Sequence, residues 1–353
     1  MSIQLCFGDE ERELSELSNM GDPLEKLLAI IDFEVFRSLL EEAFSNPART
    51  HRCGRPSWDC VLIFKILILQ QLYNISDEQT EYQIRDRLTF RRFLGLSRCP
   101  AIPDAKTIWN YRDKLAKSGK SKALFELYTN MLENSGLITK SGSIVDSTFV
   151  EAPRQRNTRE ENKTIKNGKT PEEWLANTPA MSHKLAQKDR DARWAKKHKK
   201  SYFGFKNHVK VDLDSKLIVA FCVTNASVHD SHTIVQLVDS SDQVIFADAA
   251  YAGAPLRDVL SERYPNAIQM IHERGARCKP LSKQQKADNA AKSSVRCRVE
   301  HVFGHMKKAM GGAFIRSIGI ARATVVTTLR NLAYNFSRIV HIMSKRTGLT
   351  VPG

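Results

Sequence analysis

Apolar and polar positions recur at helical spacing through the first third of the chain. Between residues 24 and 44 the apolar side chains return every three or four positions, which is typical of an amphipathic helix. An almost wholly apolar run follows a basic connector, and Ser76 with Gln79 forms a capping box that begins the next helix. Asp104 is a good N-cap for a further helix. The pattern predicts helices over residues 24–44, 58–73, 76–93 and 104–115.

From about residue 140 the period changes to that of β-structure. Residues 143–150 alternate, so that Ile144, Asp146, Thr148 and Val150 share one face of a strand. Two further β-rich runs flank a polar turn and predict a hairpin, and a compact apolar run near residue 245 is typical of a buried parallel strand. The expected strands are residues 143–150, 202–211, 217–224 and 244–247, with helices over 231–239, 255–263, 290–310 and 322–343.

This order of elements predicts an α/β (α+β) fold in two domains. Residues 1–135 form an all-helical N-terminal domain for DNA binding or dimerisation, and residues 140–353 form a mixed sheet with flanking helices. The second domain contains a polar insertion, residues 154–200, with 14 basic and 6 acidic side chains. A loop this long is either functional or disordered, and it lacks the periodicity of a core.

Two basic segments are candidate DNA contacts. In the insertion, Trp174 and Trp194 lie among lysines and arginines, where they could stack on bases while the cations track phosphates. The alternative is a solvated insertion with two incidental tryptophans. Upstream, a helix, a tight break at residues 74–75 and a basic helix with Arg85 and Arg87 are compatible with a helix-turn-helix. The alternative there is that these helices only pack against each other.

Net charge agrees with a polyanionic partner. The 353 residues carry a formal charge of +15, but the first 50 carry 4 basic and 11 acidic side chains, so the remainder carries +22. A basic body of this size favours nucleic acid, because each neutralised phosphate releases counterions. A protein that is merely basic is the alternative from composition alone.

Other protein classes are excluded by the same sequence. No apolar run reaches the roughly 18 residues of a membrane span, and the acidic start at Asp9 does not resemble a signal or transit peptide. The seven cysteines form no C-x-x-C pair, which predicts reduced thiols rather than disulfides or structural zinc. We therefore expect a cytoplasmic protein with no membrane partner and no internal repeat.

Two aspartates occupy positions that suit chemistry. Asp146 lies within a predicted strand, where a carboxylate is costly unless it is paired or binds a metal ion. Asp248 ends the apolar run Val-Ile-Phe-Ala-Asp, at the carboxyl edge where open α/β sheets place ligands. Either residue alone could be an ordinary turn or capping aspartate.

Glu300 is the only acidic residue from position 289 to the C-terminus, among 11 basic ones. On a helix, Arg296, Glu300 and Lys307 fall within about 40° of one another, beside an apolar stripe that centres about 100° away. The helix would bury this stripe and present the charged one next to the core. The alternative is a surface ion-pair ladder, since Arg296 and Glu300 are four residues apart.

Taken together, these residues resemble the DDE transposases of bacterial insertion sequences, in particular the insertion-sequence-five group. The resemblance covers about residues 20–340, and it implies a ribonuclease-H-like catalytic domain in which three carboxylates surround divalent metal. One departure is Ser293, where the family has a tyrosine. The motifs that carry the resemblance are Ser-Ile-Val-Asp-Ser-Thr, Asn-Ala-Ser-Val-His-Asp-Ser, Ala-Asp-Ala-Ala-Tyr, Arg-Cys-Arg-Val-Glu-His-Val-Phe-Gly, Ile-Ser-Asp-Glu-Gln and Ile-Pro-Asp-Ala-Lys-Thr-Ile.

The implied chemistry is phosphodiester cleavage with two Mg²⁺ (or Mn²⁺) ions, which prefer oxygen ligands. Asp146 would bridge both ions, and Asp248 and Glu300 would each complete one site. Arg296 and Lys307 would hold phosphates of the transposon end. Of the remaining family-like positions, Tyr251 would be a DNA contact or a core residue, and His208 and His229-Asp230 would be active-site or structural residues.

The resulting hypothesis is a transposase that cuts transposon ends and transfers them into target DNA. Its partners would be terminal inverted repeats and target double-stranded DNA, bound as a homodimer or higher oligomer in the bacterial nucleoid. Two alternatives remain: a ribonuclease-H-like host nuclease, and a transposase relic that binds DNA without cutting it. An intact set of carboxylates argues against the relic.

Overall fold

The computed structural model describes residues 9–45, 56–96, 101–171, 174, 185–197, 199–275 and 280–346. The described chain divides into two compact units, one of residues 1–127 with 329–353 and one of residues 128–328. This division differs from the one drawn from the sequence, because the C-terminal segment groups with the helical unit. Four of the cysteines lie outside the described residues: 6, 53, 99 and 278. The described residues contain the free thiols of Cys60, Cys222 and Cys297.

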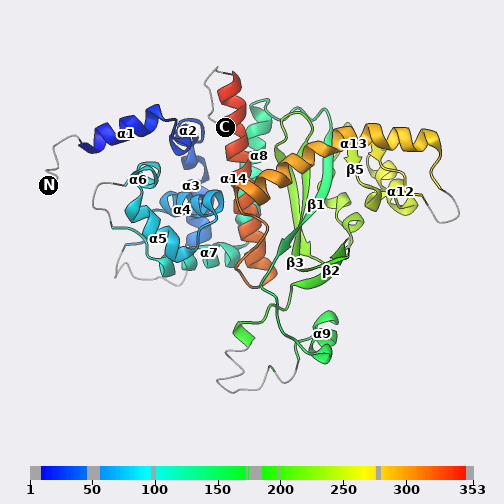
Figure 1. The fold of residues 1–353 in the computed structure, drawn as a ribbon, viewed down its shortest axis with the longest axis horizontal. Helices are drawn as coiled ribbons and strands as arrows, with labels where there is room; N and C mark the ends of the chain where they lie inside the picture. Colours follow the sequence, from blue (N-terminus) through cyan, green and yellow to red (C-terminus); the bar gives the residue numbers. More distant parts are fainter. Residues whose placement is uncertain are drawn as a thin grey trace. The chain divides into compact units, whose positions relative to one another are not determined.

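The first unit is helical (Figure 1). Its centre is a group of phenylalanines in which the ring of Phe33 lies 5.5 Å from that of Phe336 and 5.6 Å from that of Phe93. Phe36 packs 4.9 Å from Phe64 in the same core. The elements are α1 (Asp9–Asn19), α2 (Pro23–Ile30), η1 (Phe33–Phe36), α3 (Arg37–Phe44), α4 (Cys60–Tyr73), α5 (Asp77–Asp86), α6 (Leu88–Leu94), α7 (Ala105–Ser118) and the start of α8 (Ser121–Asn134).

Two of the predicted helices are interrupted. The helix expected over residues 24–44 is split into α2, η1 and α3, where the Asp32 side chain accepts a hydrogen bond from the N–H of Glu34 and caps a new turn. The helix expected over residues 76–93 is split because Arg87 is extended, with φ −95° and ψ 120°. Ser76 and Asp104 are N-caps as predicted, since each side chain accepts from the N–H of the third residue of its helix.

The second unit is built on a mixed sheet with strand order β2-β3-β1-β5-β6, and β4 pairs with β3. β1 is antiparallel to β3 and parallel to β5, which is the mixed α/β arrangement expected from the sequence. The strands are β1 (Ser143–Glu151), β2 (Arg193–Lys197), β3 (Lys200–Asp212), β4 (Ile218–Asn225), β5 (Val244–Ala247) and β6 (Ile268–Ile271).

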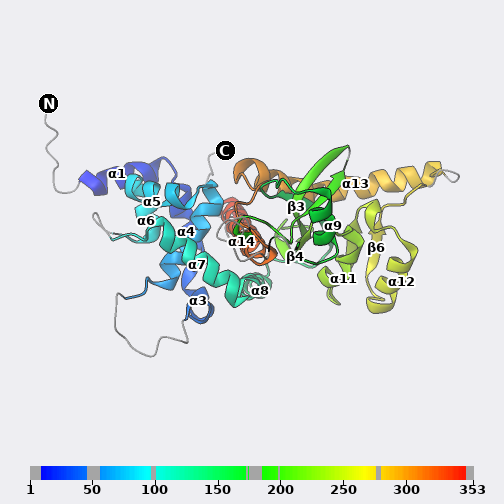
Figure 2. The ribbon, with the colours of Figure 1, turned by 90° about the horizontal axis from the view of Figure 1, so that it is seen from below.

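Helices lie on both faces of this sheet (Figure 2). α13 contacts β1 and β5, whereas α11 contacts β4. Side chains that alternate along β1 therefore have different surroundings: Val145 packs in a core cluster with Ile234 and Leu260, and the next residue faces α13. The helices of this unit are α9 (Arg159–Lys166), η3 (Asp230–His232), α11 (Ile234–Leu237), η4 (Ala249–Tyr251), α12 (Ala254–Arg263), α13 (Lys283–Gly304), η5 (His305–Ala309) and the start of α14 (Ile320–Arg346).

Within the described ranges, no single helix is long and apolar enough to cross a membrane. Only α4 and α5, whose axes differ by 101° at the break between them, reach that length and hydropathy as a pair.

Candidate active site

Asp146 and Asp248 lie side by side where the parallel pairing of β1 with β5 ends, Asp146 within β1 and Asp248 directly after β5. The register pairs Val145 of β1 with Ala247 of β5, so the next residue in each strand is an aspartate. Asp248 also caps η4, where its Oδ1 accepts a hydrogen bond from the Ala250 N–H at 3.3 Å. The structure thus brings together the two aspartates that the sequence singled out, beside the carboxyl end of β5, where ligands bind in α/β proteins.

The Asp146 carboxylate is mostly buried, with 13% of the side chain exposed, and it is ion-paired. Its Oδ1 accepts from the N–H of Ser147 at 2.7 Å, and its Oδ2 accepts from Arg296 Nη1 at 2.7 Å. Burial raises the pKa of Asp146 and the negative charge of Asp248 adds to that rise, while the Ser147 N–H and Arg296 oppose it. Because the two adjacent carboxylates repel each other and Asp146 is mostly shielded from water, a nearby positive charge stabilises their ionised forms.

Arg296 lies on α13 and joins Asp146 to Glu300. Its Nη2 is 3.4 Å from Glu300 Oε1, one helical turn along, and the Glu300 side chain is 64% exposed. Val299 and Val302 of the same helix are buried, as the apolar stripe predicted. Among the described residues no three acidic, histidine or cysteine side chains are close enough to hold a metal ion. The Arg296 guanidinium links Glu300 to Asp146.

Lys307 lies in a different kind of turn from the one expected. The α-helix ends at Gly304 and continues as a π-helical turn, η5, so the prediction of one regular helix to residue 310 is wrong. The wider turn shifts Lys307 away from the ideal angular position calculated from the sequence. Desolvation and the neighbouring Lys197 lower the pKa of Lys307, which places it in a cluster of basic residues.

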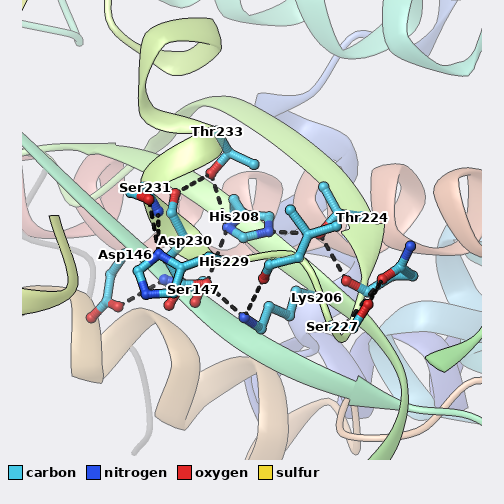
Figure 3. A network of polar contacts seen from close by, with 12 residues as sticks. Asp146, Ser147, Lys206, His208, Thr224, Ser227, His229, Asp230, Ser231 and Thr233 are labelled. Carbon is cyan, nitrogen blue, oxygen red and sulfur yellow. Dashed lines mark hydrogen bonds and ion pairs between the residues drawn. The ribbon is translucent and has the colours of Figure 1, made fainter. Parts of the chain in front are cut away.

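A polar network extends from β1 to η3 beside these carboxylates (Figure 3). Asp230 accepts from Lys206 Nζ at 2.8 Å, and its Oδ1 lies 3.8 Å from His208 Nδ1. Burial opposes ionisation of Asp230, but Lys206 and His208 outweigh it and lower the pKa of that carboxyl. His208 also contacts the hydroxyls of Thr224 at 2.8 Å and Thr233 at 3.1 Å.

This network makes His208 a structural histidine rather than an exposed acid or base. The ring is completely buried, and burial lowers its pKa to about 4. His208 is paired in register with Ser147, the residue after Asp146. The sequence had left active-site and structural roles open for His208, and the geometry favours the structural one.

Tyr251 is buried below the aspartate pair. Its side chain is 1% exposed and packs in the cluster around Val145, which is the core placement that the sequence left open as an alternative. Burial raises its pKa well above the usual value, and Asp230, Asp146 and Asp248 add to this. In this structure Tyr251 presents no surface to DNA.

Ser293 and His272 form a link that the sequence analysis missed. Ser293 lies on α13, and its Oγ is 2.9 Å from His272 Nε2. The other ring nitrogen of His272 is 3.1 Å from the carbonyl oxygen of Ala247, the residue before Asp248. α13 is thereby tied to the end of β5. No sequence pattern flagged His272, because its role depends on the position of a distant helix.

The insertion differs from a solvated loop. Trp174 is 1% exposed and its Nε1 donates to Glu161 Oε1 at 2.6 Å, so the prediction that it stacks on bases is wrong for this conformation. Trp194 on β2 is 44% exposed and lies 5.9 Å from the Arg154 guanidinium. Trp194 therefore remains a candidate stacking residue, and the insertion has a small core of its own.

The candidate DNA contacts of the helical unit are exposed. The axes of α4 and α5 differ by 101°, an interhelical angle typical of helix-turn-helix units. Asn74, at the break between them, has a φ of 50°. Arg85 on α5 is 61% exposed and lies 3.2 Å from Glu81. Arg87 lies at the break before α6, is exposed, and stacks 5.1 Å from the ring of Phe90.

Two families of known proteins match this chain. The family described as "Transposase DDE domain" matches residues 138–336, which is more than half of the chain. The chain belongs to this family of DDE transposases. A second family, described as "Transposase domain (DUF772)", matches residues 12–114, the helical part of the transposase. Members of the DDE family cleave and transfer DNA strands, and the family implies dependence on divalent metal.

One solved structure is similar to the transposase over nearly its whole length. It is the cryo-EM structure of a piggyBac transposase synaptic complex with hairpin DNA, with 12% sequence identity and a TM-score of 0.48. The similarity covers 96% of this chain and 78% of that one.

Proposed function

We propose that this transposase moves DNA by a cut-and-paste reaction in which Asp146, Asp248 and Glu300 form the catalytic centre. The observation that carries the proposal is the β1–β5 register, which sets Asp146 beside Asp248 while α13 brings Arg296 against the first of them. A host nuclease of the same fold would share these carboxylates, but the match of the helical unit to a second transposase domain favours transposition.

The donor chemistry of the three carboxylates suits divalent metal, although in this structure they do not lie close enough together to hold an ion. The donors are carboxylate oxygens, which Mg²⁺ and Mn²⁺ prefer, and the aspartate pair is already compensated by a cation, the Arg296 guanidinium. Asp146, Asp248 and Glu300 would be the residues that hold the metal. Bound ions would lower the pKa of the attacking water and stabilise the leaving oxygen.

The chain's own residues then have separate tasks. Asp146 and Asp248 are fixed by the paired strands, so their carboxylates are held in place before DNA arrives. Arg296, which touches both Asp146 and Glu300, would exchange one of these contacts for a phosphate of the transposon end. Lys307, in the basic cluster near Lys197, would hold a second phosphate. Arg85, Arg87 and Trp194 would contact DNA further from the cut.

The proposed partners are the terminal inverted repeats of an element and a double-stranded target. One protein copy would be needed at each of two ends, so we propose a homodimer or higher oligomer on DNA. The proposed location is the bacterial nucleoid in the cytoplasm, where both DNA partners lie. The first strand cut would free a 3′-hydroxyl, and that hydroxyl would attack the target.

A cleavage assay on a labelled transposon end tests the proposal. Asp146→Asn, Asp248→Asn and Glu300→Gln keep side-chain shape but remove the negative charge that a metal ion requires, so each should lower Mg²⁺-dependent cleavage by at least about 100-fold, roughly 3 kcal/mol of barrier. Binding to the same end should stay within about threefold. Asp258→Asn, an exposed aspartate on α12, is the matched control and should cleave normally.

The three variants also separate the candidate functions. If Glu300→Gln cleaved at the wild-type rate, Glu300 would leave the catalytic set. If wild-type protein bound the ends but never cut them with Mg²⁺ or Mn²⁺, the chain would be a DNA-binding relic. Cleavage without transfer of the freed 3′ end into a target plasmid would indicate a nuclease.

A further inference from the structure

The insertion and the start of α14 enclose a basic hollow that the catalytic centre does not use. Its volume is about 440 Å³, far larger than the space of one water molecule, which is about 30 Å³. In the part of the chain that the structure describes, its lining contains one carboxylate, that of Asp191, and five basic side chains. The basic lining residues are Lys169, Lys188, Arg190, Arg193 and Arg322.

Hydrogen bonds orient the Arg190 and Arg193 guanidinium groups without neutralising them. Arg190 Nη1 donates to Thr170 Oγ1 at 3.0 Å, and Arg193 donates to the carbonyl oxygens of Arg190 at 2.6 Å and Ile165 at 2.9 Å. All of these acceptors are uncharged, so the guanidinium charges remain available. Among the described residues, Lys169 takes part in no ion pair.

The one carboxylate in the hollow is engaged elsewhere. Asp191 Oδ2 accepts from the N–H of Ile320 at 2.8 Å, and the nearby Asp189 accepts from the N–H of Gly319 at 3.0 Å. These bonds hold the insertion against the beginning of α14. The hollow therefore combines a net positive lining with walls that the fold keeps in place.

Hydrogen bonds and buried side chains fix the walls of the hollow in place. A capping box at Thr158 and Glu161 begins α9, and Glu161 also accepts from the buried Trp174. Ala192, between Asp191 and Arg193, is buried in a core cluster with Ile315. Because these anchors are internal to one compact unit, little ordering is needed when an anion enters.

We propose that this hollow binds backbone phosphate of the DNA on which the transposase acts. The proposal rests on the proposed function, which supplies DNA as the partner. Phosphate oxygens match the available donors, since arginine can grip them with two parallel hydrogen bonds and lysine adds a point charge.

The position of the hollow predicts where on the DNA it acts. The insertion leaves the sheet at Glu151, five residues along β1 from Asp146, which is about 17 Å at roughly 3.4 Å per residue. Phosphates along one DNA strand are about 3.4 Å apart along the helix axis. The contacted phosphate should therefore lie about five or more nucleotides from the phosphate that is cut.

The test compares two double variants with equal loss of charge. K169A/R190A removes one lysine and one arginine from the hollow. R159A/K163A removes the same pair of residue types from exposed positions on α9 that do not line it. We expect K169A/R190A to weaken binding to a transposon end about tenfold at 0.1 M salt and to reduce the salt slope by about two contacts. R159A/K163A should change binding less than threefold.

Phosphate-ethylation interference locates the contact. Wild-type protein and R159A/K163A should share an interference position outside the cut site, and K169A/R190A should lose it. Equal loss of affinity in both double variants would overturn the proposal, because a diffuse positive field would explain it. A hollow that instead takes free phosphate would show thermal stabilisation by inorganic phosphate in the wild type but an unchanged ethylation pattern in K169A/R190A.

This experiment is independent of the catalytic assignment. If Asp146→Asn still cleaved DNA, the proposed catalytic centre would fail, yet the interference pattern would still report on the hollow. If the pattern were unchanged in K169A/R190A while Asp146→Asn lost cleavage, the hollow would fail and the catalytic centre would stand.

Discussion

A single guanidinium contacts two carboxylates at the proposed catalytic centre. Arg296 is 20% exposed and contacts the buried Asp146 at 2.7 Å and the exposed Glu300 at 3.4 Å. Exposed pairs contribute little, whereas a buried carboxylate that loses its only cation is destabilised. The contact with Asp146 should therefore matter more to stability than the ladder contact with Glu300.

Arg296→Ala should lower the free energy of unfolding by about 1–3 kcal/mol, measured in urea, because Asp146 is left buried without its partner. Arg298→Ala is the control on the same helix. Arg298 is 42% exposed and lies 3.9 Å from Asp214, so its loss should cost about 0.5 kcal/mol or less. Equal effects of the two substitutions would show that the Arg296–Asp146 bond is no stronger than a surface contact.

His208 gives the protein a pH-dependent stability. The folded state holds its pKa at about 4, while the unfolded value is about 6.5. Between these values the unfolded chain binds more protons, so the free energy of unfolding falls as the pH falls from about 6.5 to 4, by up to about 3 kcal/mol. The groups facing the ring include Asp230, Lys206 and two threonine hydroxyls, and only Asp230 opposes the shift.

Thermal unfolding at several pH values would measure this. His208→Gln should flatten the dependence between pH 6.5 and 4, whereas His232→Gln, at an exposed position in η3, should leave it as in the wild type. A slope that survived in His208→Gln would assign the pH dependence to other groups.

At the scale of elements, the close approach of β1 and β3 depends on one glycine. Gly204 has φ +145°, and a Cβ there would lie 2.4 Å from the Val150 carbonyl oxygen and 2.7 Å from the Ala152 nitrogen. Both are backbone atoms of the neighbouring strand, so they cannot move aside easily. The strand that carries Asp146 is thus held against β3 without room for a side chain.

Gly204→Ala should lower the free energy of unfolding by about 2–4 kcal/mol and reduce cleavage through displacement of β1. Gly136→Ala is the control for backbone conformation alone, since Gly136 has φ +69° and no atom within 4 Å of the added Cβ. Its cost should be about 1 kcal/mol. Circular dichroism melts of both variants separate the steric clash from the strain of positive φ.

The positions of the candidate active-site aspartates could be predicted from the sequence because their signals are local. The run before Asp248 and the alternation around Asp146 define strands β5 and β1, and parallel strands place their carboxyl ends at one edge. The lone acidic Glu300 was visible in the charge pattern. The link from Glu300 to Asp146 through Arg296 could not be seen in the sequence, because Arg296 and Asp146 are 150 residues apart.

Other features of the fold and the site could not be predicted from the sequence because they depend on tertiary contacts or on local irregularities of the backbone. Trp174 resembles an exposed residue in a basic loop, but its burial comes from pairing with Glu161 thirteen residues away. The strand β6 is short and half exposed, so it lacks both the apolar run and the alternation that identify strands. The extended Arg87 and the five-residue π turn that contains Lys307 are local departures that the hydrophobic periodicity does not reveal.

At the scale of the whole chain, charge and domain structure follow different boundaries. The first 50 residues carry net −7, although most of the helical unit that follows is basic. Meanwhile the C-terminal part of α14 groups with that helical unit, far away in sequence. Sequence order therefore does not separate a DNA-reading half from a cutting half, and fragments cut at the expected boundary of residue 135 lack part of their core.

A fragment of residues 1–135 should fold poorly by itself. Phe336 is fully buried, with its ring 5.5 Å from Phe33 and 6.1 Å from Phe36, so the fragment exposes these two rings. In the full chain, Phe336→Ala should cost about 3–5 kcal/mol of unfolding free energy. A peptide of residues 320–346 added to the fragment should restore its helical signal and sharpen its thermal transition, because it replaces the missing face. The same peptide with Phe336→Ala should do neither. A fragment that melted cooperatively without any peptide would show that the helical unit is complete before α14 joins it.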